Sequence, residues 1–199
     1  MKTLTQTIWH FALACAFVIM GSVSGTAFAQ ASKHAEKPKE AQQQTQHALS
    51  IKNRAEFDVV RQKAEAGDMQ SQYRLAIAYS DGVFVKADDK LMVEWLGKAA
   101  GQGHAEAQFY LAGMYAKGIG VMQDYQQAAT WMRKAAEKGV DMAQYNLGNM
   151  YEAGIGVQKN QKEALVWYRK SAAQGNPYAR QRMEELGAAT GKPKPAARK

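Results

Sequence analysis

Few side chains in this sequence combine a type and a spacing that could support catalysis. The histidines outside the N-terminal leader are His34, His47 and His104, and none stands in a His-Glu-x-x-His pattern or beside a cysteine pair. The sequence also lacks Gly-x-Ser-x-Gly, Ser-x-x-Lys and a phosphate-binding glycine loop. Its paired carboxylates, Asp88-Asp89 and Glu184-Glu185, fall at expected helix ends or on expected exposed faces. We therefore predict that the protein is not an enzyme and has no catalytic residue, cofactor, metal site or small-molecule substrate.

A repeat of 36 residues is the strongest signal in the sequence. Its recurring positions are Gln72, Gln108 and Gln144; Leu75, Leu111 and Leu147; Tyr79, Tyr115 and Tyr151; Gly82, Gly118 and Gly154; Trp95, Trp131 and Trp167; Lys98, Lys134 and Lys170; and Gly103, Gly139 and Gly175. A period of this length indicates a solenoid of stacked supersecondary units. Because a solenoid presents extended surfaces, the repeat predicts a binding module.

The middle repeat shows how each unit is built. Ala105, Leu111 and Tyr115 share one helical face, and glycines then break the helix. A second helix starts at Asp124, in a capping-box pattern, and ends at Gly139. We expect the tryptophans and tyrosines to be core residues. We expect each repeated glutamine to make a buried hydrogen bond to the interhelix loop.

The repeat divides the chain into segments, with eight helices and no sheet expected. Half-repeats flank the three full repeats, because Val59 stands at the tryptophan position and Asn176-Pro177 reads as a helix start. The predicted folded segments are an N-terminal capping helix (50–67), repeats one (68–103), two (104–139) and three (140–175), and a C-terminal capping helix (176–187).

The N-terminus reads as a secretory signal peptide. Lys2 precedes an apolar run, and Ala27-Phe28-Ala29 has the form that signal peptidase cleaves. Cleavage of residues 1–29 would leave Gln30 first and place the protein in the periplasm or outside the cell. The alternative is an uncleaved N-terminal membrane anchor, since Ile8 to Ala29 could just span a bilayer. Cleavage would also remove Cys15, the one cysteine of the chain, which excludes disulfides and thiol chemistry in the mature protein.

Positive charge is concentrated at the C-terminus. The chain carries a formal charge of +8, but residues 50–187 hold 18 Lys and Arg against 16 Asp and Glu. The tail, 188–199, holds four basic residues and two prolines, and we expect it to be disordered, like the polar linker 30–49. The tail could serve solubility, or it could attract anionic lipid or a wall polymer such as peptidoglycan. Nucleic acid is not an expected partner for an exported protein.

The repeat motif resembles the Sel-one-like repeat family, a relative of the tetratricopeptide repeat. The matching pattern is Ala-x-Ala-Gln-(Tyr/Phe)-x-Leu-(Gly/Ala)-x-Met-Tyr-x-x-Gly-x-Gly-Val followed by Ala-x-x-Trp-x-x-Lys-Ala-Ala-x-x-Gly, in residues 105–139 and 141–175. The resemblance implies a right-handed α/α superhelical solenoid whose first helices line a concave face. It also implies an adaptor role, and exported bacterial members are associated with envelope signalling, polysaccharide export, motility and host contact.

The first helices differ between repeats along one stripe, where we expect a groove for a protein segment. The stripe comprises Gln70, Arg74, Ile77 and Asp81; Glu106, Tyr110, Gly113 and Lys117; and Met142, Asn146, Asn149 and Ala153. The offsets of four, three and four within each set place its residues on a single helix face. The predicted contacts in this concave stripe are Arg74, Ile77, Glu106, Tyr110, Lys117, Asn146 and Asn149. Ordinary surface variability is the other interpretation of the stripe. We expect Tyr110→Ala with Asn146→Ala to abolish partner capture without changing thermal unfolding.

Phe84 is a second candidate contact, since it stands where the other repeats have Gly120 and Gly156. An aromatic residue at this position predicts a different loop geometry and an exposed apolar spot, unless the ring covers the core of the first repeat. The predicted function is therefore a non-enzymatic, monomeric adaptor of the bacterial envelope that binds a protein partner. The alternatives are a peptidoglycan- or glycan-associated protein that uses the basic tail, and a secreted host-interaction factor.

Overall fold

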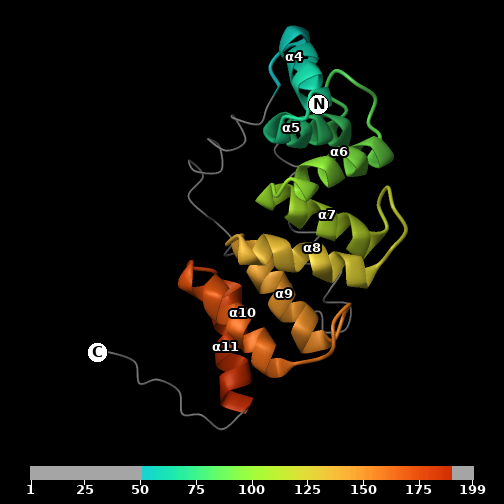
Figure 1. Cartoon of the computed structure of the whole chain (residues 1–199). Coiled ribbons are helices and arrows are strands. Elements are labelled where there is room, and N and C mark those ends of the chain that lie inside the picture. The colour runs from blue at the N-terminus through green and yellow to red at the C-terminus, as the bar shows by residue number, and fades with distance from the viewer. Residues whose placement is uncertain (1–50, 190–199) are drawn as a thin grey trace.

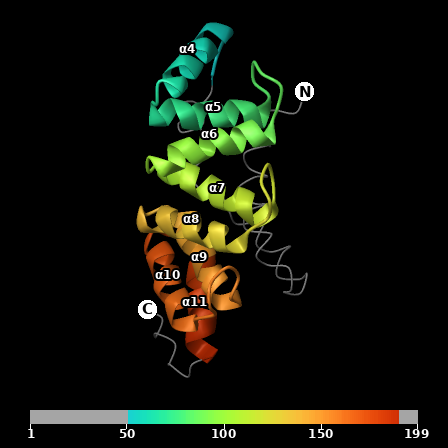
Figure 2. The ribbon, with the colours of Figure 1, turned by 45° about the vertical axis from the view of Figure 1, so that its right-hand side comes forward.

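The protein is a single stack of α-helices. The computed structural model describes residues 51–189, which form eight α-helices and no strand. The helices follow one another along the stack from α4 at one end to α11 at the other, and each packs on the helix before and after it (Figure 1, Figure 2). The predicted all-α solenoid is thus confirmed. The predicted leader (1–29), the linker (30–49) and most of the predicted tail (188–199) lie outside the described residues.

The helices alternate between the two kinds that the repeat predicts. Their bounds are α4 (Arg54–Glu65), α5 (Met69–Asp81), α6 (Asp89–Gly101), α7 (Ala105–Lys117), α8 (Tyr125–Glu137), α9 (Asp141–Ala153), α10 (Gln161–Ala173) and α11 (Pro177–Ala189). The first helices of the three repeats are α5, α7 and α9, and the second helices are α6, α8 and α10. The last helix continues to Ala189, beyond the expected boundary at residue 187.

Repeated local signals set the helix boundaries. Each second helix begins at an N-cap side chain whose Oδ1 accepts hydrogen bonds from two backbone amides, at Asp88, Asp124 and Asn160. Each first helix ends at a glycine in the left-handed region, at Gly82, Gly118 and Gly154, with φ of 69°, 70° and 77°. Because side chains other than glycine adopt this conformation at a cost, the glycine period fixes the helix period.

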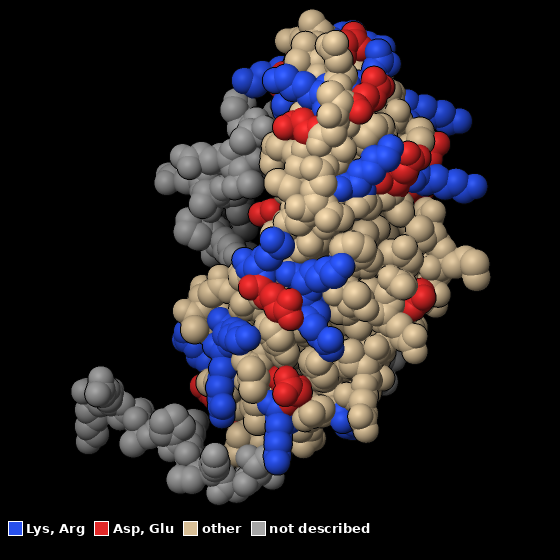
Figure 3. Space-filling model, in the orientation of Figure 1, with Lys and Arg blue, Asp and Glu red and all other residues tan. Residues whose placement is uncertain are grey.

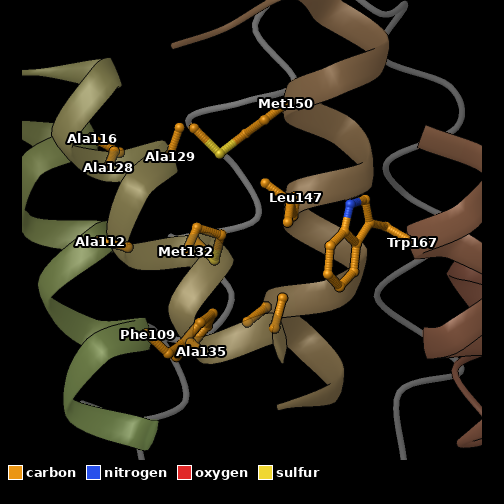
Figure 4. Close-up of a cluster of buried hydrophobic side chains, with 12 residues drawn as sticks. Phe109, Ala112, Ala116, Ala128, Ala129, Met132, Ala135, Leu147, Met150 and Trp167 are labelled. Carbon is orange, nitrogen blue, oxygen red and sulfur yellow. The ribbon is translucent and has the colours of Figure 1, made fainter. Parts of the chain in front are cut away.

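Small residues let the helices approach closely. Ala112 on α7 and Ala128 and Ala135 on α8 are fully buried, and Met132, Leu147 and Met150 fill the space between α8 and α9 (Figure 4). The tryptophans behave less uniformly than expected. Trp167 is buried, whereas Trp95 and Trp131 are half-buried. A lysine ammonium lies 3.8–3.9 Å from each indole centroid, at Lys98, Lys134 and Lys170, so each second helix carries one cation–π pair.

The repeated glutamines tie neighbouring repeats together. Nε2 of Gln72, Gln108 and Gln144 donates to a carbonyl in the last turn of the preceding second helix, at 3.2, 3.0 and 3.1 Å. The predicted buried hydrogen bond is present, although its acceptor lies in a helix and not in the interhelix loop. A second glutamine completes two of these sites. Gln102 donates to Oε1 of Gln72, and Gln174 to Oε1 of Gln144, at 2.7 and 2.9 Å.

The middle site lacks this second glutamine, because Lys138 stands at the equivalent position. The buried Oε1 of Gln108 has no hydrogen-bond partner among the described residues. We expect Lys138→Gln to stabilise the protein by roughly 0.5–1.5 kcal/mol, since the new amide can donate to this oxygen. Denaturant unfolding measures the gain, and Gln174→Lys should produce a loss of similar size. An unchanged midpoint of unfolding in both variants would show that the second glutamine adds no stability at these sites.

Candidate functional site

The first helices are more enclosed than the predicted stripe requires. All residues from 143 to 150 of α9 are buried, whereas α6, α8 and α10 each keep an exposed face. The middle of α9 is thus enclosed by the elements packed around it. The stripe is therefore not an open row of unpacked side chains, and its members have different environments.

At the N-terminal end, two predicted contacts are used by the fold. The guanidinium of Arg74 forms an ion pair with Glu56 of α4, and both side chains are partly buried. Ile77 packs against the cluster that contains Met92 and Leu96. A hydrogen bond from the Lys52 backbone amide lowers the pKa of Glu56, and the Arg74 guanidinium lowers it further. The variation between repeats at these two positions therefore reflects packing against α4 and α6.

In the middle repeat the stripe runs beside an aromatic cluster. The half-buried ring of Tyr110 lies 6.1 Å from Tyr73 and 5.6 Å from Phe109, centroid to centroid. Glu106 is exposed at the start of α7, and Lys117 is half-buried at its end. Tyr110 thus bridges the first two repeats, while Glu106 is a solvent-facing member of the stripe.

His104, at the N-cap of α7, is buried against Tyr73 at 4.4 Å between ring centroids. Its Nδ1 accepts a hydrogen bond from the Ala107 amide at 3.3 Å, and its Nε2 lies 3.0 Å from Oε1 of Gln70. This arrangement requires a neutral ring with the proton on Nε2. Burial lowers the pKa of His104, and the carboxylate of Glu106 offsets part of that effect.

A lowered pKa of His104 in the folded state makes stability depend on pH. The unfolded chain, with a pKa of about 6.5, then binds the proton more readily than the folded protein. The stabilisation is present above that value and is lost as the pH falls through the folded pKa. We expect the free energy of unfolding to decrease as the pH falls below the unfolded pKa of about 6.5. His104→Asn retains a cap acceptor and should flatten this slope in denaturant titrations. The same slope in both proteins would show that His104 is not its source.

In the third repeat, two predicted contacts are buried amides. Asn146 is fully buried and Asn149 is 6% exposed, one helical turn apart on α9. Neither side-chain polar atom of Asn146 has a hydrogen-bond partner among the described residues, and Nδ2 of Asn149 is also unpaired. Since truncation of a fully buried side chain leaves a cavity, Asn146→Ala should not leave thermal unfolding unchanged, contrary to our expectation.

Beside Asn149 lies a polar cluster that the sequence interpretation missed. The hydroxyl of Tyr168 on α10 lies 2.6 Å from Oδ1 of Asn149 and 2.7 Å from Oε2 of Glu152. Glu152 forms an ion pair with Arg182 of α11. Because a hydroxyl has one proton, it can donate to only one of the two oxygens. The Asn149 amide therefore either accepts this proton or turns its Nδ2 toward the hydroxyl, and in both orientations one of its polar atoms stays unpaired.

The electrostatics of this cluster favour a neutral tyrosine and a charged Glu152–Arg182 pair. Burial, and then the hydrogen bond to Glu152, raise the pKa of the Tyr168 hydroxyl far above its ordinary value. Burial lowers the pKa of Arg182, but the charge and the hydrogen bond of Glu152, together with Tyr168 and Glu185, outweigh burial, and the net change is a rise. The cluster joins α9, α10 and α11 as a structural unit.

Phe84 differs from its prediction in backbone geometry. Its φ of 62° lies in the left-handed region, close to 69° at Gly120 and 68° at Gly156. The expected change of loop geometry is therefore wrong. The ring is 38% exposed and lies 6.2 Å from Phe57 of α4, centroid to centroid. The carbonyl of Phe84 accepts a hydrogen bond from Arg54 at 2.7 Å. Phe84 thus covers part of the first-repeat core and leaves part of its ring exposed.

Neither a metal site nor a membrane-spanning helix is found in residues 51–189. No group of three or more His, Cys, Asp or Glu side chains there is placed to hold a metal ion. Among the helices of residues 51–189, none is both long enough and apolar enough to cross a membrane.

The solenoid and its repeat motif define a helical repeat protein, and comparison with known families gives its class. The model of the Sel1 repeat matches residues 70–104, 105–140 and 141–176, so the chain belongs to the Sel1 repeat family. Sel1 repeat proteins are generally protein-interaction scaffolds, and their fold is generally non-catalytic. A search of curated proteins gives no match.

Solved structures show the same fold. A Sel1 repeat protein from Oxalobacter formigenes is 39% identical with a TM-score of 0.61, and the match covers 65% of this chain and 97% of that one. A protective antigen of uropathogenic Escherichia coli strains is 35% identical with a TM-score of 0.65, covering 71% of this chain and 29% of that one. Helicobacter pylori cysteine-rich protein B, at 22% identity and a TM-score of 0.50 over 63% of this chain and 90% of that one, resembles it in fold alone.

Proposed function

We propose that this chain is a non-enzymatic adaptor of the bacterial cell envelope that binds an extended segment of a partner protein along its first helices. Membership of a family of protein-interaction scaffolds supports the general role. The leader-like N-terminus, with Ala27-Phe28-Ala29 at its end, supports export to the envelope. The unpaired amides of α9 support the place of binding.

The buried amide of Asn146 carries the proposal. An amide side chain offers a donor and an acceptor side by side, and one peptide unit of an extended chain offers the complementary carbonyl and N–H. An unpaired buried polar group costs roughly 1–3 kcal/mol. Stability alone therefore gives no reason for an amide at this position, since an apolar side chain such as leucine, with the same number of heavy atoms, would leave no polar atom unpaired. A partner's backbone would supply the missing hydrogen bonds.

Burial also constrains how binding occurs. Because Asn146 has no exposed surface, a partner must displace side chains packed around it. Tyr110 occupies the equivalent position one repeat earlier and is half-buried. We propose that movement at this part of the stripe opens the site, with Asn149 providing a further polar atom one turn away.

The test is partner capture by Asn146→Leu compared with Gln126→Leu, an exposed glutamine of α8 whose side chain lies on the opposite kind of helix. Cells that express the full sequence are fractionated and crosslinked, and the captured proteins are identified. We expect one dominant partner in the envelope fraction, lost with Asn146→Leu and kept with Gln126→Leu. Thermal unfolding of both variants is measured alongside capture, and a cooperative transition well above the temperature of the assay separates lost binding from lost folding.

Two results would contradict the proposal. Equal capture by both variants would exclude Asn146 as a contact and with it the first-helix site. Recovery of the protein from the cytoplasm with an intact leader would exclude the envelope role while leaving the scaffold role in place.

A further inference from the structure

The second helices carry an exposed row of side chains that the proposed adaptor site does not use. We define the outer stripe as the four positions spaced i, i+4, i+7 and i+8 that share one face of each second helix. It comprises Lys90, Glu94, Gly97 and Lys98 on α6; Gln126, Thr130, Arg133 and Lys134 on α8; and Lys162, Val166, Arg169 and Lys170 on α10. All of these except the half-buried Gly97 are exposed.

The charge of the outer stripe changes along the stack. On α6, Glu94 forms an ion pair with Lys98 at 2.7 Å. On α8 and α10 the position of this glutamate is taken by threonine and valine, and the glycine position by Arg133 and Arg169. Among the described residues, no carboxylate lies within 4.0 Å of either arginine or of the lysine that follows it. The second and third repeats thus keep the Trp–Lys pair but lack the carboxylate that neutralises the lysine in the first repeat.

Neighbouring side chains extend this basic surface. The exposed cations around α8 and α10 are Arg133, Lys134, Lys138, Lys159, Lys162, Arg169 and Lys170, and the exposed carboxylates of the same two helices are Glu137 and Glu163. Figure 3 shows basic atoms over the region of α8 and α10 with fewer acidic atoms among them, while basic and acidic atoms alternate over the first repeat. The hydrogen bond from Arg133 to the Tyr151 hydroxyl, at 2.6 Å, positions its guanidinium without neutralising it.

The chemistry of this surface fits one kind of partner. Val166, which is 40% exposed, stands on α10 between Lys162 and Arg169. An extended peptide would need donors and acceptors for its backbone, whereas the outer stripe of α8 and α10 offers mainly cations and an aliphatic side chain. Stacking of sugar rings on the tryptophans is disfavoured because each indole face carries a lysine ammonium. A bilayer surface with anionic headgroups needs only charge and shallow apolar contact.

We propose that the outer face of α8 and α10 docks on the surface of a membrane that contains anionic phospholipid. The cations bind the headgroups and Val166 rests at the interface. This surface lies on the second helices, so the first helices stay available for a protein partner. The four basic residues of the C-terminal tail follow α11 in the sequence and add to the same attraction.

The test measures partitioning of the protein, recovered from cells that express the full sequence, onto vesicles. One set is phosphatidylcholine alone, and in the other roughly one third of the lipid is phosphatidylglycerol. Arg133→Gln with Arg169→Gln is compared with Lys90→Gln and Lys98→Gln, which removes the same net charge from the outer stripe of α6. We expect the partition coefficient on anionic vesicles to fall about 30-fold in the first variant and less than about threefold in the second. Added salt should weaken wild-type binding.

Control experiments distinguish this surface from other sources of membrane binding. The difference between the two variants should persist in a chain that ends at residue 189, because the folded face and not the tail carries the proposal. Equal binding to both kinds of vesicle would indicate apolar insertion, and an equal loss in both double variants would indicate net charge alone. Binding to soluble polyglutamate without binding to vesicles would indicate an acidic protein partner. Each of these three results would overturn the proposal.

Discussion

Gly156→Ala is expected to destabilise the protein by roughly 3–5 kcal/mol, from backbone overlap and an unfavourable φ together. A Cβ atom at Gly156 would lie 1.9 Å from the carbonyl oxygen of Tyr125, at the start of α8 in the preceding repeat. The φ of Gly156 is +68°, a conformation that alanine adopts only at a cost. Because the opposing atom belongs to the backbone, no side-chain rotation can relieve the overlap, and the loop must separate from α8.

Gly139→Ala is the matched control. Gly139 also has a positive φ, +89°, but no atom lies within 4 Å of a Cβ built there. Gly139→Ala should therefore lower the free energy of unfolding by about 1–2 kcal/mol, the cost of the left-handed conformation alone. Chemical denaturation of the two variants separates the cost of the backbone overlap from the cost of the unfavourable φ. Similar losses of stability in the two variants would mean that the loop of the third repeat moves away from α8 at little cost. Its contact with α8 would then contribute little to the coupling between repeats.

The same contact explains the glycine pattern of the interhelix loops. These loops lie along one edge of the stack (Figure 1), and a Cβ at Gly120 would lie 2.3 Å from the carbonyl of Asp89. Each loop therefore rests on the first turn of the second helix one repeat earlier. In the first repeat that helix is α4, which begins at Arg54, one residue later than the repeat spacing from α6 would place it. In the loop of the first repeat, Phe84 takes the position of Gly120 and Gly156. It keeps a glycine-like φ, and its ring lies against Phe57 of α4.

The repeat period, the caps and the glycines predicted the helices well because each acts within a few residues. Asp124 caps α8 and Gly118 ends α7 by interactions with their own backbone neighbours. The exposure of the stripe could not be predicted in this way. Variation between repeats suggested free positions, but Arg74 varies because it meets Glu56 of α4, and Asn146 is enclosed by packing on all sides. Both environments depend on which helix lies alongside, and helix periodicity carries no such information.

The cluster around Tyr168 was missed for a related reason, although the sequence did carry a signal. Positions 76 and 112 are alanine and face Leu96 and Met132 at the equivalent positions of their second helices, whereas the third repeat has Gly148 with Tyr168. A smaller residue and a larger one exchanged together at paired positions indicate a contact. Comparison of the repeats one position at a time does not reveal it.

This paired exchange leads to a double-mutant prediction. A Cβ at Gly148 would lie 2.5 Å from Cε1 of Tyr168, whose ring is fully buried and held by hydrogen bonds to its hydroxyl. Gly148→Ala should therefore lose roughly 1–3 kcal/mol through overpacking, despite the better helix propensity of alanine. Tyr168→Met should also lose roughly 1–3 kcal/mol, because Asn149 and Glu152 lose their hydroxyl partner.

Combined, the two substitutions recreate the Ala112–Met132 pair of the second repeat. In the double variant the Tyr168 ring, which the new methyl group would overlap, is absent. Its loss of stability should therefore be smaller than the sum of the two single losses by roughly 1–3 kcal/mol. Urea unfolding of the four proteins gives this coupling energy. Additive losses would place the strain of Gly148→Ala elsewhere than on the Tyr168 ring. A positive coupling would locate the strain of Gly148→Ala on the Tyr168 ring, whose hydroxyl contacts Glu152 and, through that carboxylate, Arg182 of α11.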